Sequence, residues 1–369
     1  MFAAGYCEKP RSNSILRRSH MKKLNFTLPF AGYDQLSFIN SFASVYMYLE
    51  NIAYDDDYVC PQKATGHCNG CGNCKRSSGR IQEDLYFLFD TLSGRSSLRP
   101  AFEGEAPDLG SSSETIQFCM GFAGYDFIKV TERFRETLAA EIDAGRPVIS
   151  LMKDARFGRT RVLIGYDGDQ IIMADPKGAQ QAPKAAPVYE DIDCMYAVAG
   201  TGRTKYSLAD GLRNIRRVMS ENRDKQIWDD CISRFRYWDN KLPDMPFEHL
   251  QAMFKRICDL AWYNFNCHNF AETFRHRVID ELRNPQLDGA CRQIDVSYDG
   301  AHTRNWQLIG LYECRDWSKR RYHELEWGMC ECVVQCLQAL KQYDAEVLSA
   351  VDDMLAVLSK AEASCHAQP

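Results

Sequence analysis

The sequence of 369 residues lacks several features that would assign it at once to a class of protein. It has no run of eighteen apolar residues, which a membrane-spanning helix needs, and its first twenty residues lack the apolar core of an export signal. Neither charge dominates, because 45 lysines and arginines stand against 50 aspartates and glutamates. These absences predict a cytoplasmic protein that associates with neither membranes nor nucleic acid.

Motifs of nucleotide and metal-dependent enzymes are also missing. The sequence contains no phosphate-binding glycine fingerprint, no P-loop and no HExxH pair. Cysteine is frequent, with 16 residues, but disulfides are disfavoured in a cytoplasmic protein. Most of the cysteines are scattered singly, and we interpret these as small buried hydrophobic residues, for example Cys194, Cys231, Cys258 and Cys314.

Tryptophan is absent from the first half of the chain, since all 6 tryptophans lie beyond residue 205. We therefore expect a boundary near residues 201–206, with one domain over residues 26–203 and a second over residues 204–369. The polar and basic residues 1–25 are expected to form a disordered tail, and Met21 is an alternative start of translation.

The two domains differ in their apolar patterns. In the first, apolar spacing predicts helices followed by short strands. The helices are expected over residues 37–50, 83–92, 113–122 and 131–145, and the strands over residues 147–152, 161–165, 170–175 and 194–200. The second domain is expected to be an antiparallel helical bundle, with helices over residues 207–219, 246–265, 320–341 and 345–361.

Two motifs of the first domain resemble those of a known family. Residues 40–44 read Asn-Ser-Phe-Ala-Ser at the first buried helix, and residues 159–176 read RTRVLIGYDGDQIIMADP. They resemble the Cys-x-x-Ala-Ser helix start and the His, Gly-Tyr-Asp and Asp-Pro hairpin of bacteriocin-processing cysteine peptidase domains and, more closely, of the family of butirosin-biosynthesis protein H N-terminal domains. The resemblance covers about residues 26–200. It implies an α+β protein in which a papain-like domain precedes an all-α bundle.

The resemblance also implies roles for four positions. Gln35 would stabilise an oxyanion, Asn40 occupies the position of the nucleophile, Arg159 that of the base, and Asp175 that of the orienting carboxylate. Asparagine forms no thiolate, and a guanidinium accepts no proton at neutral pH. We therefore expect a non-catalytic cleft that binds a small molecule, a peptide or a carrier protein.

Two questions stay open at this stage. Arg159 can pair with Asp175 across the hairpin, bind an anion, or simply be exposed at a strand end. The alternative to a non-catalytic protein is an acyltransferase that moves an acyl group from a carrier-protein thioester to an amine, or a cysteine peptidase. Either would need a relocated nucleophile, such as Ser37, Ser41 or Cys119, and none of these has an evident histidine partner.

A cysteine-rich insert over residues 54–78 predicts a metal site. Its core, CPQKATGHCNGCGNC, places four thiols at a spacing that lets them converge on one ion, with His67 as a spare ligand. The predicted ligands are Cys60, Cys68, Cys71 and Cys74. Zinc with a structural role is the first interpretation, and an iron–sulfur cluster is the alternative.

Further groups in the second domain have simpler interpretations. Cys332 and Cys336 share a helical face with His323 nearby and are expected to be core residues, and we assign no metal to Cys267, His268 or His276. A basic helix surface is expected to be solvated, although it could dock an acidic partner. It is made of Arg213, Arg216, Arg217, Arg223 and Lys225.

Overall fold

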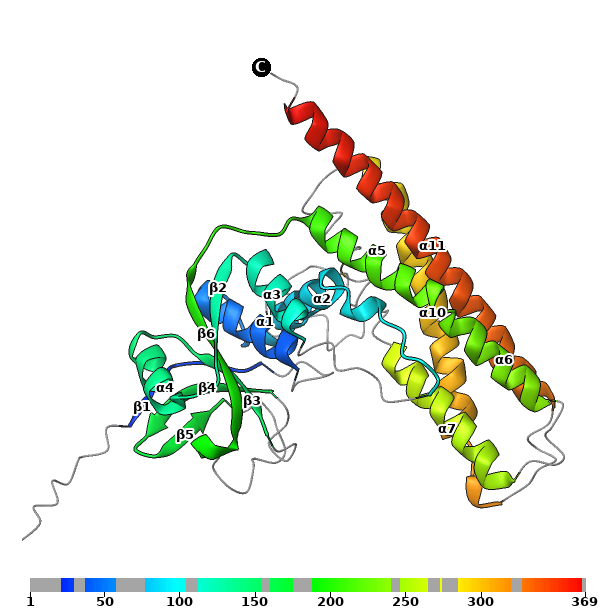
Figure 1. Cartoon of the computed structure of the whole chain (residues 1–369), viewed down its shortest axis with the longest axis horizontal. Helices are drawn as coiled ribbons and strands as arrows, with labels where there is room; N and C mark the ends of the chain where they lie inside the picture. Colours follow the sequence, from blue (N-terminus) through cyan, green and yellow to red (C-terminus); the bar gives the residue numbers. More distant parts are fainter. Residues whose placement is uncertain are drawn as a thin grey trace, which may run out of the picture.

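The protein combines an antiparallel sheet with many helices, which confirms the predicted α+β class (Figure 1). The computed structural model describes residues 21–29, 37–57, 77–103, 112–153, 160–174, 188–239, 246–264, 273, 285–319 and 327–366. None of the helices within these ranges is both long and apolar enough to cross a membrane.

The first part of the chain holds the strands and four helices. The strands are β1 (Lys22–Lys23), β2 (Tyr125–Val130), β3 (Val148–Met152), β4 (Thr160–Asp167), β5 (Gln170–Met173) and β6 (Ile192–Thr201). The helices are α1 (Phe38–Leu49), α2 (Ser78–Leu92), α3 (Ser113–Phe122) and α4 (Phe134–Asp143).

The described residues of the second part form helices and their connections, without a strand. Its helices are α5 (Leu208–Asp224), α6 (Ile227–Asp239), α7 (Phe247–Asn264), α10 (Asp288–Glu313) and α11 (Trp327–His366). The last strand ends at Thr201 and α5 begins at Leu208, so the change from sheet to helix falls close to the expected boundary.

The 6-stranded sheet follows the order β1-β4-β3-β6-β2, with β5 also paired to β4, and all pairs are antiparallel. The predicted hairpin is present as β4 and β5, and Gly168 supplies the left-handed φ of 60° in its turn. Gly165 of β4 is paired with Lys23 of β1, and a Cβ at Gly165 would collide with the carbonyl oxygen of Lys22. The close pairing of β1 therefore requires glycine at this position.

Alternating residues of the central strands face two separate cores. Val162 and Ile164 of β4 pack with α1, α2 and α3 on one face of the sheet, whereas Leu163 packs with α4 on the other. In β3, Ile149 joins the first core and Val148 the second. The sheet is thus a middle layer between α4 and the group formed by α1, α2 and α3.

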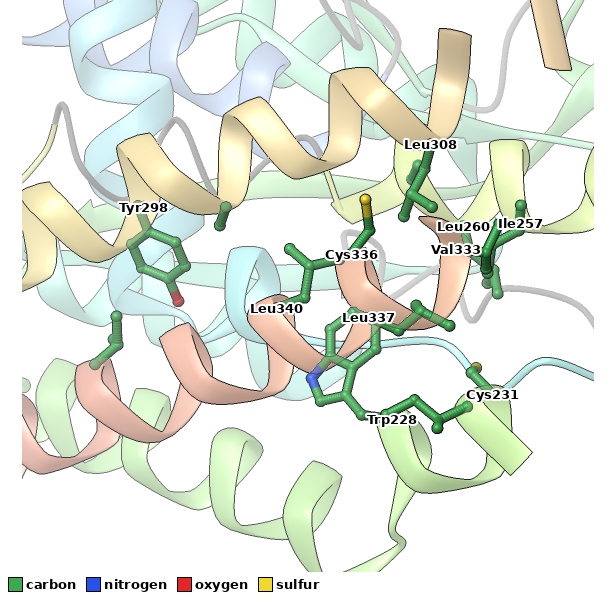
Figure 2. Close-up of a cluster of buried hydrophobic side chains, with 14 of the residues drawn as sticks. Trp228, Cys231, Ile257, Leu260, Tyr298, Leu308, Val333, Cys336, Leu337 and Leu340 are labelled. Carbon is green, nitrogen blue, oxygen red and sulfur yellow. The ribbon is translucent and has the colours of Figure 1, made fainter. Parts of the chain in front are cut away.

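The helical part has a large core of its own, shown in Figure 2. Helix α11 packs along α10 and α6, and Trp228 of α6 lies close to Leu337 and Leu340 of α11. This core also takes in Leu92 from α2 and Phe118 from α3. The core of the bundle therefore extends into the sheet-bearing part through α2 and α3, and in Figure 1 α2 lies between the sheet and the bundle.

Several elements differ from the sequence-based prediction. Strand β1 falls within the expected tail, so a tail can extend no further than residue 21. Strand β2 and helices α6 and α10 were not predicted, and the two expected C-terminal helices form the single helix α11. Helix α4 begins after Arg133, which has a φ of 56°, and not after Thr131.

Candidate functional site

Only one of the four family-equivalent positions lies within the described residues. Asn40 is in the first turn of α1, whereas Gln35, Arg159 and Asp175 lie outside the described ranges. The chain neighbours of the last two, Thr160 and Ala174, are described. The site is therefore built from Asn40 and from the strand ends that carry the hairpin.

Helix α1 begins in a way that fixes the orientation of Asn40. Ser37 is the N-cap, and its side-chain oxygen accepts a hydrogen bond of 3.2 Å from the backbone amide of Asn40. The next amide, of Ser41, donates to the Ser37 carbonyl at 3.1 Å. Nine of the residues in α1 are buried, so the helix is held on several sides. Asn40 consequently sits in a rigid first turn.

The side chain of Asn40 is buried and engaged with α2. Its residue exposure is 2%, and its Oδ1 accepts a hydrogen bond of 2.5 Å from Nε2 of Gln82. The same Gln82 amide lies 3.0 Å from the Asn40 carbonyl oxygen. The position that resembles a cysteine nucleophile is thus occupied by half of a buried pair of amides, which offers hydrogen bonds and no nucleophile.

Gln82 was not identified from the sequence, although its amide donates to both the side chain and the backbone carbonyl of Asn40. It is completely buried, and its Oε1 has no hydrogen-bond partner among the described residues. A buried amide oxygen without a partner is costly in a folded protein. It therefore marks a point where a water molecule or a ligand donor would be stabilised.

Gln82 belongs to a row of polar side chains along the inner face of α2. Ser78, Gln82, Tyr86 and Asp90 follow one another at intervals of four residues, and each is buried. Asp90 pairs with Arg95 at 2.5 Å, and the same guanidinium donates to the Tyr86 hydroxyl at 3.1 Å. The row is therefore bonded in separate groups: Gln82 bonds to Asn40 of α1, whereas Tyr86 and Asp90 share Arg95.

The hairpin ends lie on the same side of the sheet as α1. Val162 and Ile164 of β4 share a core with α1, and the two elements are in contact. The amide of Ala174 donates to the carbonyl of Val162 at 2.8 Å, which continues the pairing of β5 with β4 to the open end of the hairpin. Thr160 is buried there, and its Oγ1 has no partner among the described residues.

Among the described residues, no cysteine and histidine combine in the sheet-bearing part. His67 is the only histidine between residues 21 and 206, and it lies outside the described residues. Cys119 of α3 is fully buried, and that burial, followed by the negative charge of Asp90, raises the pKa of its thiol. A thiol with a raised pKa carries little thiolate at neutral pH, so Cys119 is a poor relocated nucleophile.

Other buried thiols show the same direction of change. Burial raises the pKa to about 12 for Cys231 and Cys336 and to about 11 for Cys258 and Cys291. Cys336 lies in the bundle core with Leu337 and Leu340, as Figure 2 shows. These positions act as apolar core residues at neutral pH.

The predicted metal ligands lie outside the described residues, as do His67, Cys267, His268, His276 and His323. Within the described ranges, no group of three or more histidine, cysteine or acidic side chains is placed to hold a metal ion. The metal site over residues 60–74 therefore stays a prediction.

The basic surface predicted on α5 is compensated by acidic side chains. Each basic residue of that surface has an acidic neighbour within 4.0 Å. The pairs are Arg213 with Asp210, Arg216 with Asp352, Arg217 with Glu221, Arg223 with Asp224, and Lys225 with Glu221. A surface paired in this way offers little excess positive charge to an acidic partner.

In comparison with known proteins, no family model and no curated protein matches the chain.

Proposed function

We propose that the sheet-bearing part is a papain-like domain without catalytic activity, whose cleft beside Asn40 binds a small molecule, a peptide or a carrier protein. The observation that carries the proposal is the buried pair of Asn40 and Gln82 at the start of α1. A papain-like enzyme needs a thiolate there, stabilised by the helix N-terminus. An amide pair can orient a ligand by hydrogen bonds but cannot attack it.

The layout of the described elements supports the papain-like assignment. The buried helix α1 precedes five of the six strands of an antiparallel sheet, and the β4–β5 hairpin shares a core with that helix. In the sequence, Arg159 directly precedes Thr160 of β4 and Asp175 directly follows Ala174. The arginine would meet an anionic group of the ligand, or the two side chains would pair with each other.

The state of the thiols disfavours the enzymatic alternative. An acyltransferase or peptidase with a relocated nucleophile would need a cysteine of lowered pKa or a serine beside a base. The pKa of Cys119 is raised, and Ser37 already accepts a hydrogen bond as the N-cap of α1. Neither group is prepared for attack on a thioester or a peptide.

The catalytic half of the proposal is tested with an acyl N-acetylcysteamine thioester, which imitates the end of an acylated carrier protein. We expect thiol release at the rate of the buffer blank, with or without an added amine. When native protein is alkylated with an iodoacetamide-alkyne, the thioester should not reduce the labelling of any cysteine. Saturable turnover that is lost when Cys119→Ala or Ser41→Ala is introduced would show that the protein is an enzyme.

The binding half is tested by amide hydrogen exchange. The probes are the same thioester, a tripeptide with a free carboxylate, and inorganic phosphate. We expect one of them to protect residues 38–44 and 160–164 in the wild type. Gln82→Glu, which replaces the donor with an acceptor, should abolish that protection, whereas the exposed control Gln117→Glu should retain it. Absence of protection by all three probes would contradict binding in this cleft.

A further inference from the structure

A cavity in the bundle shares no residue with the site proposed beside Asn40. It is a cavity of about 510 Å³ between α5, α6 and α11. Its apolar lining comes from Met219 at the end of α5, Ile227 and Trp228 at the start of α6, and Leu348 of α11. This volume falls in the range of pockets that hold small organic molecules, and an aromatic ring with aliphatic neighbours is a common lining for them.

The charged residues around this cavity are all engaged with charges of the opposite sign. Five such residues line it, and each is in an ion pair with a distance of 3.2 Å or less. The pairs are Arg223 with Asp224, Asp229 with Lys341, Asp344 with Arg99, and Asp352 with Arg216. A charged ligand would have to break one of these pairs or remain unpaired in a partly desolvated site.

The polar group of Trp228 is also engaged. Its indole Nε1 donates to Oδ2 of Asp344 at 2.8 Å, and the residue is largely buried. The ring is further held by the core around Leu337 and Leu340, seen in Figure 2. Trp228 therefore offers the cavity a fixed aromatic surface and no free hydrogen-bond donor.

We propose that this cavity is a binding site for an uncharged, aromatic small molecule. The compensated charges select against ions of either sign, while Trp228, Met219 and Leu348 provide contacts for a flat ring system. None of its lining residues belongs to the sheet-bearing part, so its occupancy is independent of the function proposed for the site beside Asn40.

Two dyes with the same ring skeleton test the proposal on the full chain. N-phenyl-1-naphthylamine is uncharged, and 8-anilino-1-naphthalenesulfonate adds one negative charge. We expect the uncharged dye to bind at one site per chain with a dissociation constant of about 10 to 200 μM, the range that its roughly 17 non-hydrogen atoms suggest. Energy transfer from Trp228 should accompany binding. The sulfonate should bind about tenfold more weakly or worse, since it has no free cation to meet.

Variants at the rim locate the site without disturbing the core. Ala345 and Ser349 both line the cavity and are exposed on α11, so Ala345→Trp and Ser349→Trp should fill it while the protein stays folded. Each should weaken the uncharged dye about tenfold or more. Val296→Trp adds the same ring at an exposed position of α10, which is 66% accessible, and should leave binding unchanged.

Three outcomes would overturn the proposal. The first is absence of saturable binding of the uncharged dye to wild-type protein. The second is equal or tighter binding of the sulfonate, which would refute the uncharged class of ligand. The third is an unchanged affinity in both Ala345→Trp and Ser349→Trp, when circular dichroism shows that each variant is folded. The site is supported if wild-type protein prefers the uncharged dye over the sulfonate and if Ala345→Trp and Ser349→Trp both weaken binding of the uncharged dye.

Discussion

The ion pair between Arg99 and Asp344 predicts a large loss of stability when either partner is changed. Arg99 follows α2 in the sheet-bearing part, and Asp344 is in the middle of α11. Their side chains are 3% and 16% exposed, and two guanidinium nitrogens reach the carboxylate at 2.8 Å and 3.1 Å. Arg99 also donates to the carbonyls of Ser96 and Leu98, while Trp228 donates to Asp344. The pair is therefore the centre of a buried network that joins the two parts of the chain.

The size of the effect follows from this burial. Removal of one partner of a buried pair leaves an unpaired charge and typically costs about 3–5 kcal/mol. We expect Arg99→Met and Asp344→Asn each to lower the free energy of unfolding by about 3 kcal/mol or more. Asparagine at 344 can still accept from Trp228, so the double variant should cost little more than the worse single variant. The resulting coupling energy should be about 2–3 kcal/mol.

A pair one turn earlier on α11 provides the control. Lys341 and Asp229 are joined at 2.6 Å, but their side chains are 50% and 48% exposed. Solvent screens such a pair, so Lys341→Met and Asp229→Asn should each cost no more than about 1 kcal/mol. The comparison separates the effect of burial from that of charge, because both pairs connect α11 to an element outside it.

Urea unfolding measures these values, with two signals recorded on the same samples. Tryptophan fluorescence reports on the bundle, since all 6 tryptophans lie beyond residue 205, and circular dichroism reports on the whole chain. If Arg99 joins the two parts, Arg99→Met should also separate the two transitions along the urea axis. A loss below about 1 kcal/mol, with a coupling no larger than that of the exposed pair, would refute the reasoning.

Four further predictions concern single features. Gln226 has a φ of 51°, so Gln226→Gly should raise the free energy of unfolding by about 0.5–1 kcal/mol, whereas Gln226→Ala should not. Gly165→Ala should cost about 1–3 kcal/mol and speed amide exchange in β1, and Gly289→Ala, where no atom lies within 4 Å of the added carbon, should do neither. The hydrogen bond from Lys22 lowers the pKa of Asp143 in the folded protein. The stabilisation from this bond should be fully present above the unfolded pKa of about 4 and be lost as pH falls through the lower pKa of the folded state. Faster amide exchange in β1 at acidic pH would report this loss. Elemental analysis of protein purified with and without air should find one zinc, or the iron of a cluster, per chain; neither element at a stoichiometric level would refute the site over residues 60–74.

The elements that the sequence predicted well are those whose apolar period matches their burial. Helices α1, α3 and α7 and strands β3, β4 and β6 lie within or close to the predicted ranges, and most of their apolar residues are buried. Strand β2 was missed because it is an edge strand whose middle, near Ile128, is exposed, and its pairing with β6 is a long-range contact. Edge pairing of this kind has no local signal.

The sequence predicted two helices where the structure has the single helix α11, because charged residues that pair with other elements resemble a polar connection. Helices were expected over residues 320–341 and 345–361, which left the polar and aromatic residues 342–344 as a connection. No glycine or proline occurs between Met329 and His366, so nothing in the backbone interrupts the helix. The polar residues point instead to partners elsewhere, such as Asp344 to Arg99 and Lys341 to Asp229.

Of the two buried amides in the site, only Asn40 could be predicted from the sequence, for a related reason. A motif located Asn40, but its partner Gln82 lies 42 residues further on, within a row of polar residues spaced four apart on α2. Periodicity assigns such a row to solvent, because an amphipathic helix usually turns its polar face outward. Here Gln82 and Asp90 are both completely buried: Gln82 bonds to Asn40 of α1, and Asp90 pairs with Arg95. The helical period places Gln82 and Asp90 on one face of α2. Only the packing of α1 against α2 shows that Gln82 is turned toward Asn40.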